Sequence, residues 1–147
     1  MLNDTLINFY ERDLRKLIEE VNLFRNEENL WKTQGSVKNS SGNLVLHIIG
    51  GMNYLVGTLL AHTGYVRDRD QEFIRKGVAG RVLVAQLEEL IHLIKETLSE
   101  LTPEAMEEDY PIPFDGAKRS TSYVLIQLTL HINYHLGQVN YLRRMLE

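Results

Sequence analysis

The sequence contains no cysteine, and this absence excludes several kinds of site at once. Disulfide bonds, thiolate metal ligands and a cysteine nucleophile are all ruled out, because each needs a cysteine sulfur. A thiol that takes part in chemistry on this protein must therefore arrive as a substrate.

The chain also lacks an excess of positive charge. Its 16 basic and 20 acidic side chains give a formal net charge of −4, which provides no strong positive field for phosphate backbones or anionic lipids. We expect neither a nucleic-acid partner nor a membrane partner.

Membrane-targeting and membrane-spanning segments are missing as well. The first residues, MLNDTLINFY, lack the basic segment and apolar run of a signal peptide. No apolar run approaches the ~20 residues needed to span a bilayer. These features predict a cytoplasmic protein without a membrane anchor.

What the chain does contain is enough apolar residues for one core. Of its 147 residues, 44% are hydrophobic and 24% are charged. A chain of this length buries roughly 70% of its unfolded surface. No internal repeat or low-complexity tract divides it, so we predict a single domain over residues 1–147.

Hydrophobic periodicity predicts an all-α domain. Apolar residues recur at alternating three- and four-residue steps, the spacing of one helix face, in four long segments. These segments are residues 3–24, 42–60, 83–101 and 121–146. Ser40 or Ser41 can cap the second segment, and Thr102 followed by Pro103 predicts a brief extra turn after the third.

The connections complete the predicted architecture. We expect residues 62–80 to form a loop with at most one helical turn, and residues 109–119 to form a long connection or a small β-ribbon. Four helices with one long crossover connection make a four-helix bundle. Gly50 and Gly51 lie inside the second helix and each costs about 1 kcal/mol of helix propensity, so another group is expected to approach closely there.

The sequence LHINYHLGQVNY, residues 130–141, carries two histidines one helical turn apart. His131, His135 and Gln138 share a wedge of about 60°, and the three-four spacing predicts that His135 lies in the core seam. The two histidine Cβ atoms are expected about 6 Å apart, a distance that one divalent cation can bridge. Two hydrogen-bonded core histidines are the alternative, and either account requires a polar partner.

A third ligand candidate lies on the second predicted helix. His47 lies at the margin of the apolar arc, where its side chain can point inward. Asn43 and Tyr54 are on the same strip of the helix. His62 and His92 have no polar cluster at their spacing, so we assign both to the surface.

Two segments, NLVLHIIGGMNYLVG and LTLHINYHLGQVNYLRRML, together resemble the DinB-like, or YfiT-like, superfamily. The resemblance covers nearly the whole chain, and the loop RDRDQEF is similar to that of an uncharacterised branch. It implies an up-down-down-up four-helix bundle, often a homodimer, in which His47, His131 and His135 coordinate a divalent metal. Relatives in the superfamily include metal-dependent transferases that use low-molecular-weight thiols such as bacillithiol or mycothiol, and many proteins with no established activity.

The ligand count indicates what such a site can do. Three neutral imidazoles leave one or more metal positions open to water or substrate, as in catalytic rather than structural sites. The metal can activate water for hydrolysis or hold an external thiolate, and zinc or nickel is expected before iron or another metal. We predict a metal-dependent enzyme with a small-molecule substrate, a thiol S-transferase before a hydrolase. A non-catalytic metal-binding protein and a structural dimer are the alternatives.

Polar residues on the histidine faces are candidates for contacts to the metal ligands or to the substrate. They are Gln138, Asn43, Gln127 and Tyr54. Each can equally be a helix-face residue that makes ordinary hydrogen bonds.

No aspartate or glutamate shares the histidine faces, so a general base must come from a loop. Asp115 and Glu72 are candidates, and metal-bound hydroxide is the alternative. Arg67, Arg69 and Arg75 can steer an anionic substrate, but the acidic residues between them favour local salt bridges.

Overall fold

The helices begin and end close to where the periodicity places them. The computed structural model describes residues 1–147, and its only β-structure is two isolated bridges, Asp109 with Ser120 and Phe114 with Ala117. The helices are α1 (Leu2–Leu23), η1 (Glu27–Trp31), α2 (Ser41–Met52), η2 (Asn53–Thr58), α3 (Leu59–Ala61), α4 (Arg69–Ile74), α5 (Gly80–Glu100), α6 (Pro103–Glu107) and α7 (Thr121–Leu146). The prediction of an all-α chain is confirmed.

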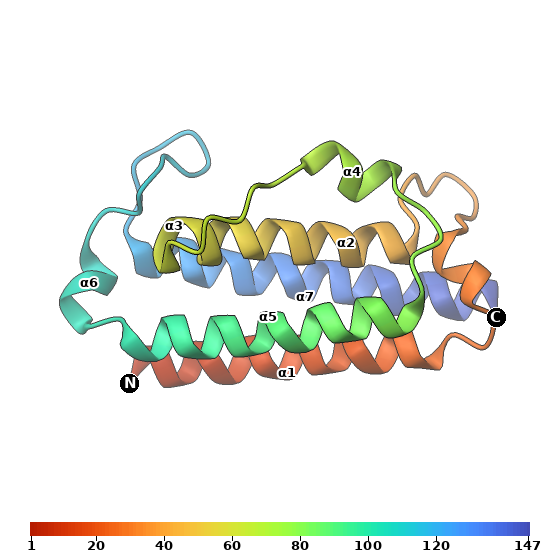
Figure 1. The fold of residues 1–147 in the computed structure, drawn as a ribbon, viewed down its shortest axis with the longest axis horizontal. Coiled ribbons are helices and arrows are strands. Elements are labelled where there is room, and N and C mark those ends of the chain that lie inside the picture. Colours follow the sequence, from red (N-terminus) through yellow and green to blue (C-terminus); the bar gives the residue numbers. More distant parts are fainter.

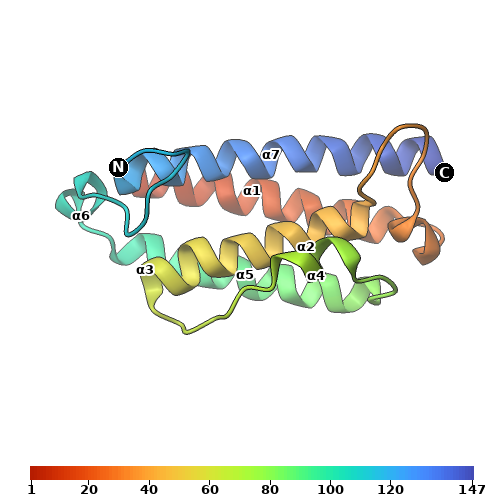
Figure 2. The same ribbon diagram turned by 90° about the horizontal axis from the view of Figure 1, so that it is seen from above.

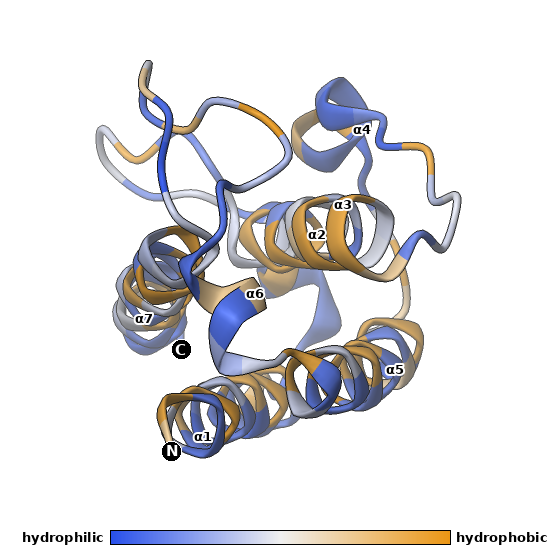
Figure 3. Ribbon diagram, turned by 90° about the vertical axis from the view of Figure 1, so that its left-hand side faces the viewer, coloured by the Kyte–Doolittle hydropathy of each residue, from blue (hydrophilic) through white to orange (hydrophobic).

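Four long helical segments lie side by side (Figures 1 and 2): α1, the continuous run α2–η2–α3, α5 and α7. α1 packs against α5 and α7, and α2 packs against the same two helices. The colours in Figure 1 show that α1 and α7 run in one direction along the molecule, whereas α2 and α5 run in the other. Seen end-on, the short α4 lies outside α2 and covers its outer side (Figure 3).

The core lies between these segments. A cluster of 30 buried hydrophobic residues draws side chains from all of the long helices. Two helix ends are capped as the sequence predicts, since Ser40 caps α2 and Thr102 caps α6 with Pro103 in its first turn. Ser120 caps α7 in the same way, by accepting a backbone N–H.

The face of α7 differs from the prediction at one position. The sequence pattern put His135 in the core seam, but Leu136 is the buried residue, and His135 is only partly buried. The reason is the rotation of α7, whose two histidines turn toward His47 of α2 instead of toward the centre of the core. The expected β-ribbon after α6 is likewise reduced to the two isolated bridges.

One helical run has the length and composition of a membrane span. Ser41–Ala61 covers 21 residues with a mean hydropathy of 1.7, so the expectation that no apolar run reaches this length is wrong. All residues of α2 are buried within the fold, which is the property of a core helix. We assign this run to the core.

Three hydrogen bonds between polar side chains, here called the polar ladder, join α1 to α7. The Asn133 amide donates to Asp13 Oδ2 at 2.9 Å, the Asn140 amide donates to Glu20 Oε1 at 2.7 Å, and Arg143 Nε donates to Glu20 Oε2 at 2.7 Å. Both carboxylates are buried, so their charges depend on these partners. The ladder therefore sets the register and rotation of α7 on α1.

Glu20→Ala tests this ladder. We expect the free energy of unfolding to fall by about 2 kcal/mol, because Arg143 and Asn140 lose their acceptor in a buried setting. Urea denaturation measures the change. Glu19→Ala is the control, since Glu19 is exposed and its loss is expected to cost at most about 0.5 kcal/mol. Equal effects of the two substitutions would contradict the ladder.

Candidate metal centre

Three histidines converge where α2 and α7 lie against each other. His47 comes from α2, and His131 and His135 come from consecutive turns of α7. One ring nitrogen from each histidine lies within 4.8 Å of the others, and Nε2 of His47 is 3.1 Å from Nε2 of His131. The ring centroids of His131 and His135 are 4.4 Å apart. The three imidazoles that the sequence singled out do lie together.

The closest pair of these nitrogens has a spacing that suits a shared divalent cation. Zinc–imidazole bonds of ~2.0–2.1 Å in a tetrahedral site put ligand nitrogens about 3.3 Å apart. The 3.1 Å between His47 and His131 is near this value, although a direct hydrogen bond between the two rings has the same length. That hydrogen bond leaves His135 unsatisfied, because its Nε2 is buried and has no hydrogen-bond partner. The cluster can therefore hold a metal ion that satisfies all three rings.

The outer nitrogens of two of the rings are held by oxygen acceptors. Nδ1 of His47 is 3.0 Å from Glu72 Oε1, and Nδ1 of His135 is 2.7 Å from Gln138 Oε1. Because these oxygens accept, each Nδ1 carries the proton and each Nε2 keeps its lone pair. Metal-binding histidines characteristically donate their second N–H to a carboxylate or carbonyl in this way. The tautomers that ligation needs are thus set by the chain itself.

Glu72 reaches His47 from α4 and is clamped there by Arg67. Arg67 Nε donates to Glu72 Oε2 and Nη2 donates to Oε1, both at 2.9 Å. The pair is bidentate, and the Glu72 carboxylate is buried, so its orientation is closely fixed. The expected local salt bridges form only here, because Arg69 and Arg75 make no ion pair.

The glycine pair in α2 makes this approach sterically feasible. A Cβ on Gly50 would overlap the Glu72 carboxylate, and a Cβ on Gly51 would lie 3.3 Å from Arg67 Nη2. The predicted close approach at these glycines is confirmed. Sequence reasoning missed Glu72 and Arg67 as partners of His47, and the two glycines were the available signal.

Burial keeps two of the imidazoles, those of His131 and His47, in the neutral form that binds metal. It lowers the pKa of His131 to about 4, with further lowering from His135, His47 and Arg67. Burial also lowers the pKa of His47, against the opposing effect of the hydrogen bond that His47 donates to Glu72. Because a metal binds the neutral imidazole, the site is ready for a cation at neutral pH.

A cleft of about 300 Å³ opens beside His47 and His131. Its other lining residues are Ile48, Gly51, Met52, Leu55, Arg67, Arg69, Phe114, Asp115, Gln127, Leu128 and Ile132. Six of the 13 lining residues are hydrophobic, and Arg67, Arg69 and Asp115 carry the charges. A small molecule that occupies this cleft lies against His47 and His131.

The four polar candidates occupy different places. Gln138 contacts His135, and Gln127 lines the cleft. Tyr54 does not line it. The Asn43 amide donates to the backbone carbonyls of Glu72 and Arg75, at 3.0 and 2.8 Å, and so ties the α4 segment to α2.

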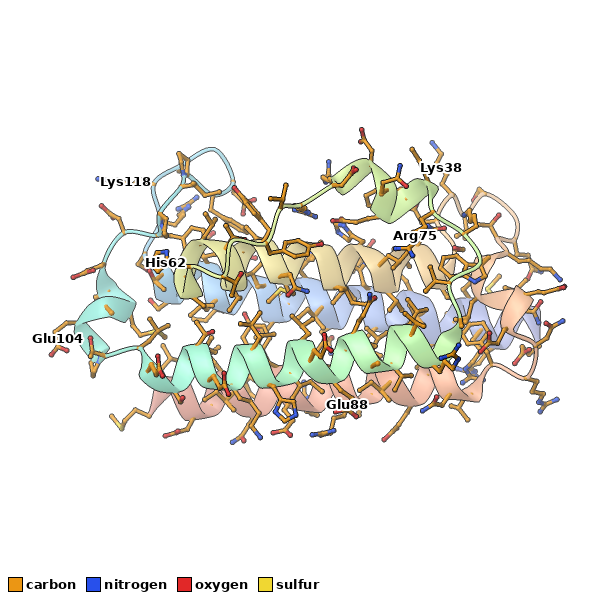
Figure 4. All side chains as sticks on the ribbon, in the orientation of Figure 1. Lys38, His62, Arg75, Glu88, Glu104 and Lys118 are labelled. Atoms are coloured by element: carbon orange, nitrogen blue, oxygen red, sulfur yellow. The ribbon has the colours of Figure 1, made fainter.

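The two general-base candidates and the two remaining histidines also lie in different environments. Asp115 lines the cleft, whereas both oxygens of Glu72 are engaged by His47 and Arg67. His62 and His92 are exposed, and Figure 4 places His62 at the end of α3.

Gly50→Ala tests whether the close approach of α4 orients His47. The added methyl group displaces the Glu72 carboxylate, and we expect metal affinity to fall about 10- to 100-fold, the usual effect of losing such a partner. Calorimetric titration of the untagged, metal-stripped protein with Zn²⁺ measures the affinity.

Gly137→Ala is the matched control for this substitution. Gly137 is also helical, but nothing lies within 4 Å of a Cβ built there. We expect unchanged metal affinity and a gain in stability of roughly 0.5–1 kcal/mol from helix propensity. Equal affinities in both variants would show that Glu72 does not orient His47.

Comparison with known proteins adds a family but no activity. No curated protein matches the sequence. Residues 4–147 match the profile of a family described as "Protein of unknown function (DUF1572)". Since the match covers nearly the whole chain, this protein belongs to the DUF1572 family.

Proposed function

We propose that this protein is a metal-dependent enzyme of the DinB-like superfamily, with one divalent cation held by His47, His131 and His135. The observation that carries the proposal is the buried, unpartnered Nε2 of His135 beside the other two rings. A hydrogen bond between His47 and His131 satisfies those two rings only, whereas a cation satisfies all three. Zinc or nickel suits these ligands first, and iron follows.

The arrangement of the helices supports the superfamily assignment. α1 and α7 run one way and α2 and α5 the other, and a long connection through α6 joins α5 to α7. This order corresponds to an up-down-down-up four-helix bundle with one crossover connection. The histidines lie on the second and fourth long segments, where the resemblance places them.

We propose thiol S-transfer as the reaction, ahead of hydrolysis. When bound, a divalent cation stabilises a thiolate close to an electrophile. The chain has no cysteine, so the thiol comes from a small bacillithiol-type cosubstrate. Glu72 is fully engaged and cannot serve as a general base, and attack by a thiolate needs none. Asp115 is the base candidate for the hydrolase alternative.

The chain's own residues position the reactants. Glu72 and Gln138 orient His47 and His135, and the apolar lining residues of the cleft give the carbon chain of a bound thiol a surface to pack on. We place the protein in the cytoplasm, a compartment that keeps thiols reduced.

Metal analysis of the untagged protein tests the site. We expect about one equivalent of a divalent metal in the wild type and less than about a tenth of this in His135→Ala, because two imidazoles no longer enclose the ion. His92→Ala is the control, since His92 is exposed on α5. Unchanged metal content in His135→Ala would contradict the proposed metal site.

The reaction is tested on the same preparations. Metal-loaded wild type should conjugate a bacillithiol-type thiol with an electrophile such as monochlorobimane, and His135→Ala should lose this activity. Metal binding without turnover would instead favour a non-catalytic metal-binding protein.

We propose that the protein is a homodimer that uses an exposed apolar stripe on α7. The stripe is formed by Ile126, Leu130, Tyr134 and Tyr141. At 100° per residue these positions fall within about 80° on one helix face. An unpartnered stripe of this kind suits self-complementary packing about a two-fold axis.

Sedimentation equilibrium tests the dimer. The wild type should have the mass of two chains, and Leu130→Asp should shift it toward one chain by placing a charge in the interface. Leu23→Asp is the control, because Leu23 is an exposed leucine at the end of α1. A monomeric wild type would contradict the proposed homodimer.

A further inference from the structure

The cleft beside the histidines is bordered by a positive charge that the fold leaves free. Arg67 and Arg69 both line it, and Asp115 is the carboxylate in its lining. Arg67 is neutralised by Glu72. Arg69 makes no ion pair and no side-chain hydrogen bond, although 20 acidic side chains are present in the chain.

Arg69 is nevertheless held in place by an aromatic ring. Its guanidinium lies 5.8 Å from the ring centroid of Phe73, within the range of a cation–π contact. The Phe73 ring in turn packs on His47, with centroids 4.9 Å apart. One ring therefore contacts both the free guanidinium and a metal-ligand candidate.

The flanking acids do not neutralise Arg69. Asp68 uses its side chain to cap α4 by accepting the Gln71 N–H, and Asp70 makes no ion pair. With three neutral imidazoles as ligands, a cation at the histidines would add two further positive charges to the same cleft. Asp115 would offset one of these charges, so the cleft would be positive with the cation bound, in a chain whose net charge is −4.

We propose that Arg69 binds a carboxylate of the thiol substrate, so that the cleft selects acidic low-molecular-weight thiols. In this arrangement the sulfur lies at the histidines, the carbon chain lies against the apolar lining residues Met52 and Leu128, and the carboxylate pairs with Arg69. A guanidinium and a carboxylate form a charge-assisted, bidentate pair, which a neutral thiol cannot make. This inference rests on the proposed function, because it requires a thiolate held by a metal.

The experiment compares matched thiols on the cobalt-substituted protein. ω-Mercaptocarboxylates with two to six carbons are titrated beside the ω-mercaptoalcohols of the same length, and the sulfur-to-cobalt charge-transfer absorption reports binding. The readout is the ratio of the two dissociation constants at each length. Failure to bind cobalt, or absence of the charge-transfer band with every thiol, would contradict the proposed function rather than this inference.

The inference predicts a clear preference in the wild type. At the best-fitting length we expect the carboxylate to bind about 10- to 100-fold more tightly than the alcohol, as for a hydrogen bond to a charged group. Arg69→Gln should bring the ratio close to one. Equal dissociation constants at all lengths in the wild type, or an undiminished ratio in Arg69→Gln, would overturn the inference.

Arg75→Gln is the matched control for Arg69→Gln. Arg75 directly follows α4 (Figure 4) and is also an exposed, unpaired arginine. It lines a different hollow, together with Gln86 and Glu89. The substitution removes the same charge, so a nonspecific effect of net charge should lower the ratio equally. We expect Arg75→Gln to keep the wild-type ratio, and a loss equal to that of Arg69→Gln would overturn a specific role for Arg69.

Discussion

The contact between the Glu72 carboxylate and the His47 imidazole is the interaction on which the rest of the site depends. It joins the short outer helix α4 to α2, and it needs a bare surface at Gly50. Each of the two glycines destabilises the helix by about 1 kcal/mol relative to alanine. Because a Cβ at Gly50 or Gly51 would meet Glu72 or Arg67, the glycine pair is explained by the approach of this segment to the histidine site. Arg67 completes the arrangement by holding the carboxylate in one orientation.

The other half of the site is oriented from the opposite face of α7. Asn133 and Asn140 lie about 180–200° around the helix from His131, at 100° per residue. Their bonds to Asp13 and Glu20 anchor that face on α1. Since a helix is rigid in rotation along its length, the ladder directs the two imidazoles of α7 toward α2. Buried polar pairs at the α1–α7 contact thus determine where the histidines point.

Much of the fold could be predicted because its helices are long and strongly periodic, and α7 was predicted over the residues that it occupies. The three histidines could be found because helical spacing fixes the relation of His131 to His135. Glu72 could not, since it lies 25 residues from His47 on a helix too short to show periodicity. Asn43 is one turn before His47, yet its amide turns to the α4 carbonyls, because tertiary contacts decide where a polar side chain is satisfied.

The charge balance of the site explains why its chemistry suits an anion. The imidazoles of His47 and His131 are neutral near pH 7, because burial lowers the pKa values of both. The carboxylate nearest to them is cancelled by Arg67. A divalent cation held by these ligands, as we propose, would therefore keep its full charge, unlike one held by a carboxylate or thiolate ligand. The strongest partner for such a centre is an incoming anion, and in a chain without cysteine a thiolate of this kind has to be carried by the substrate.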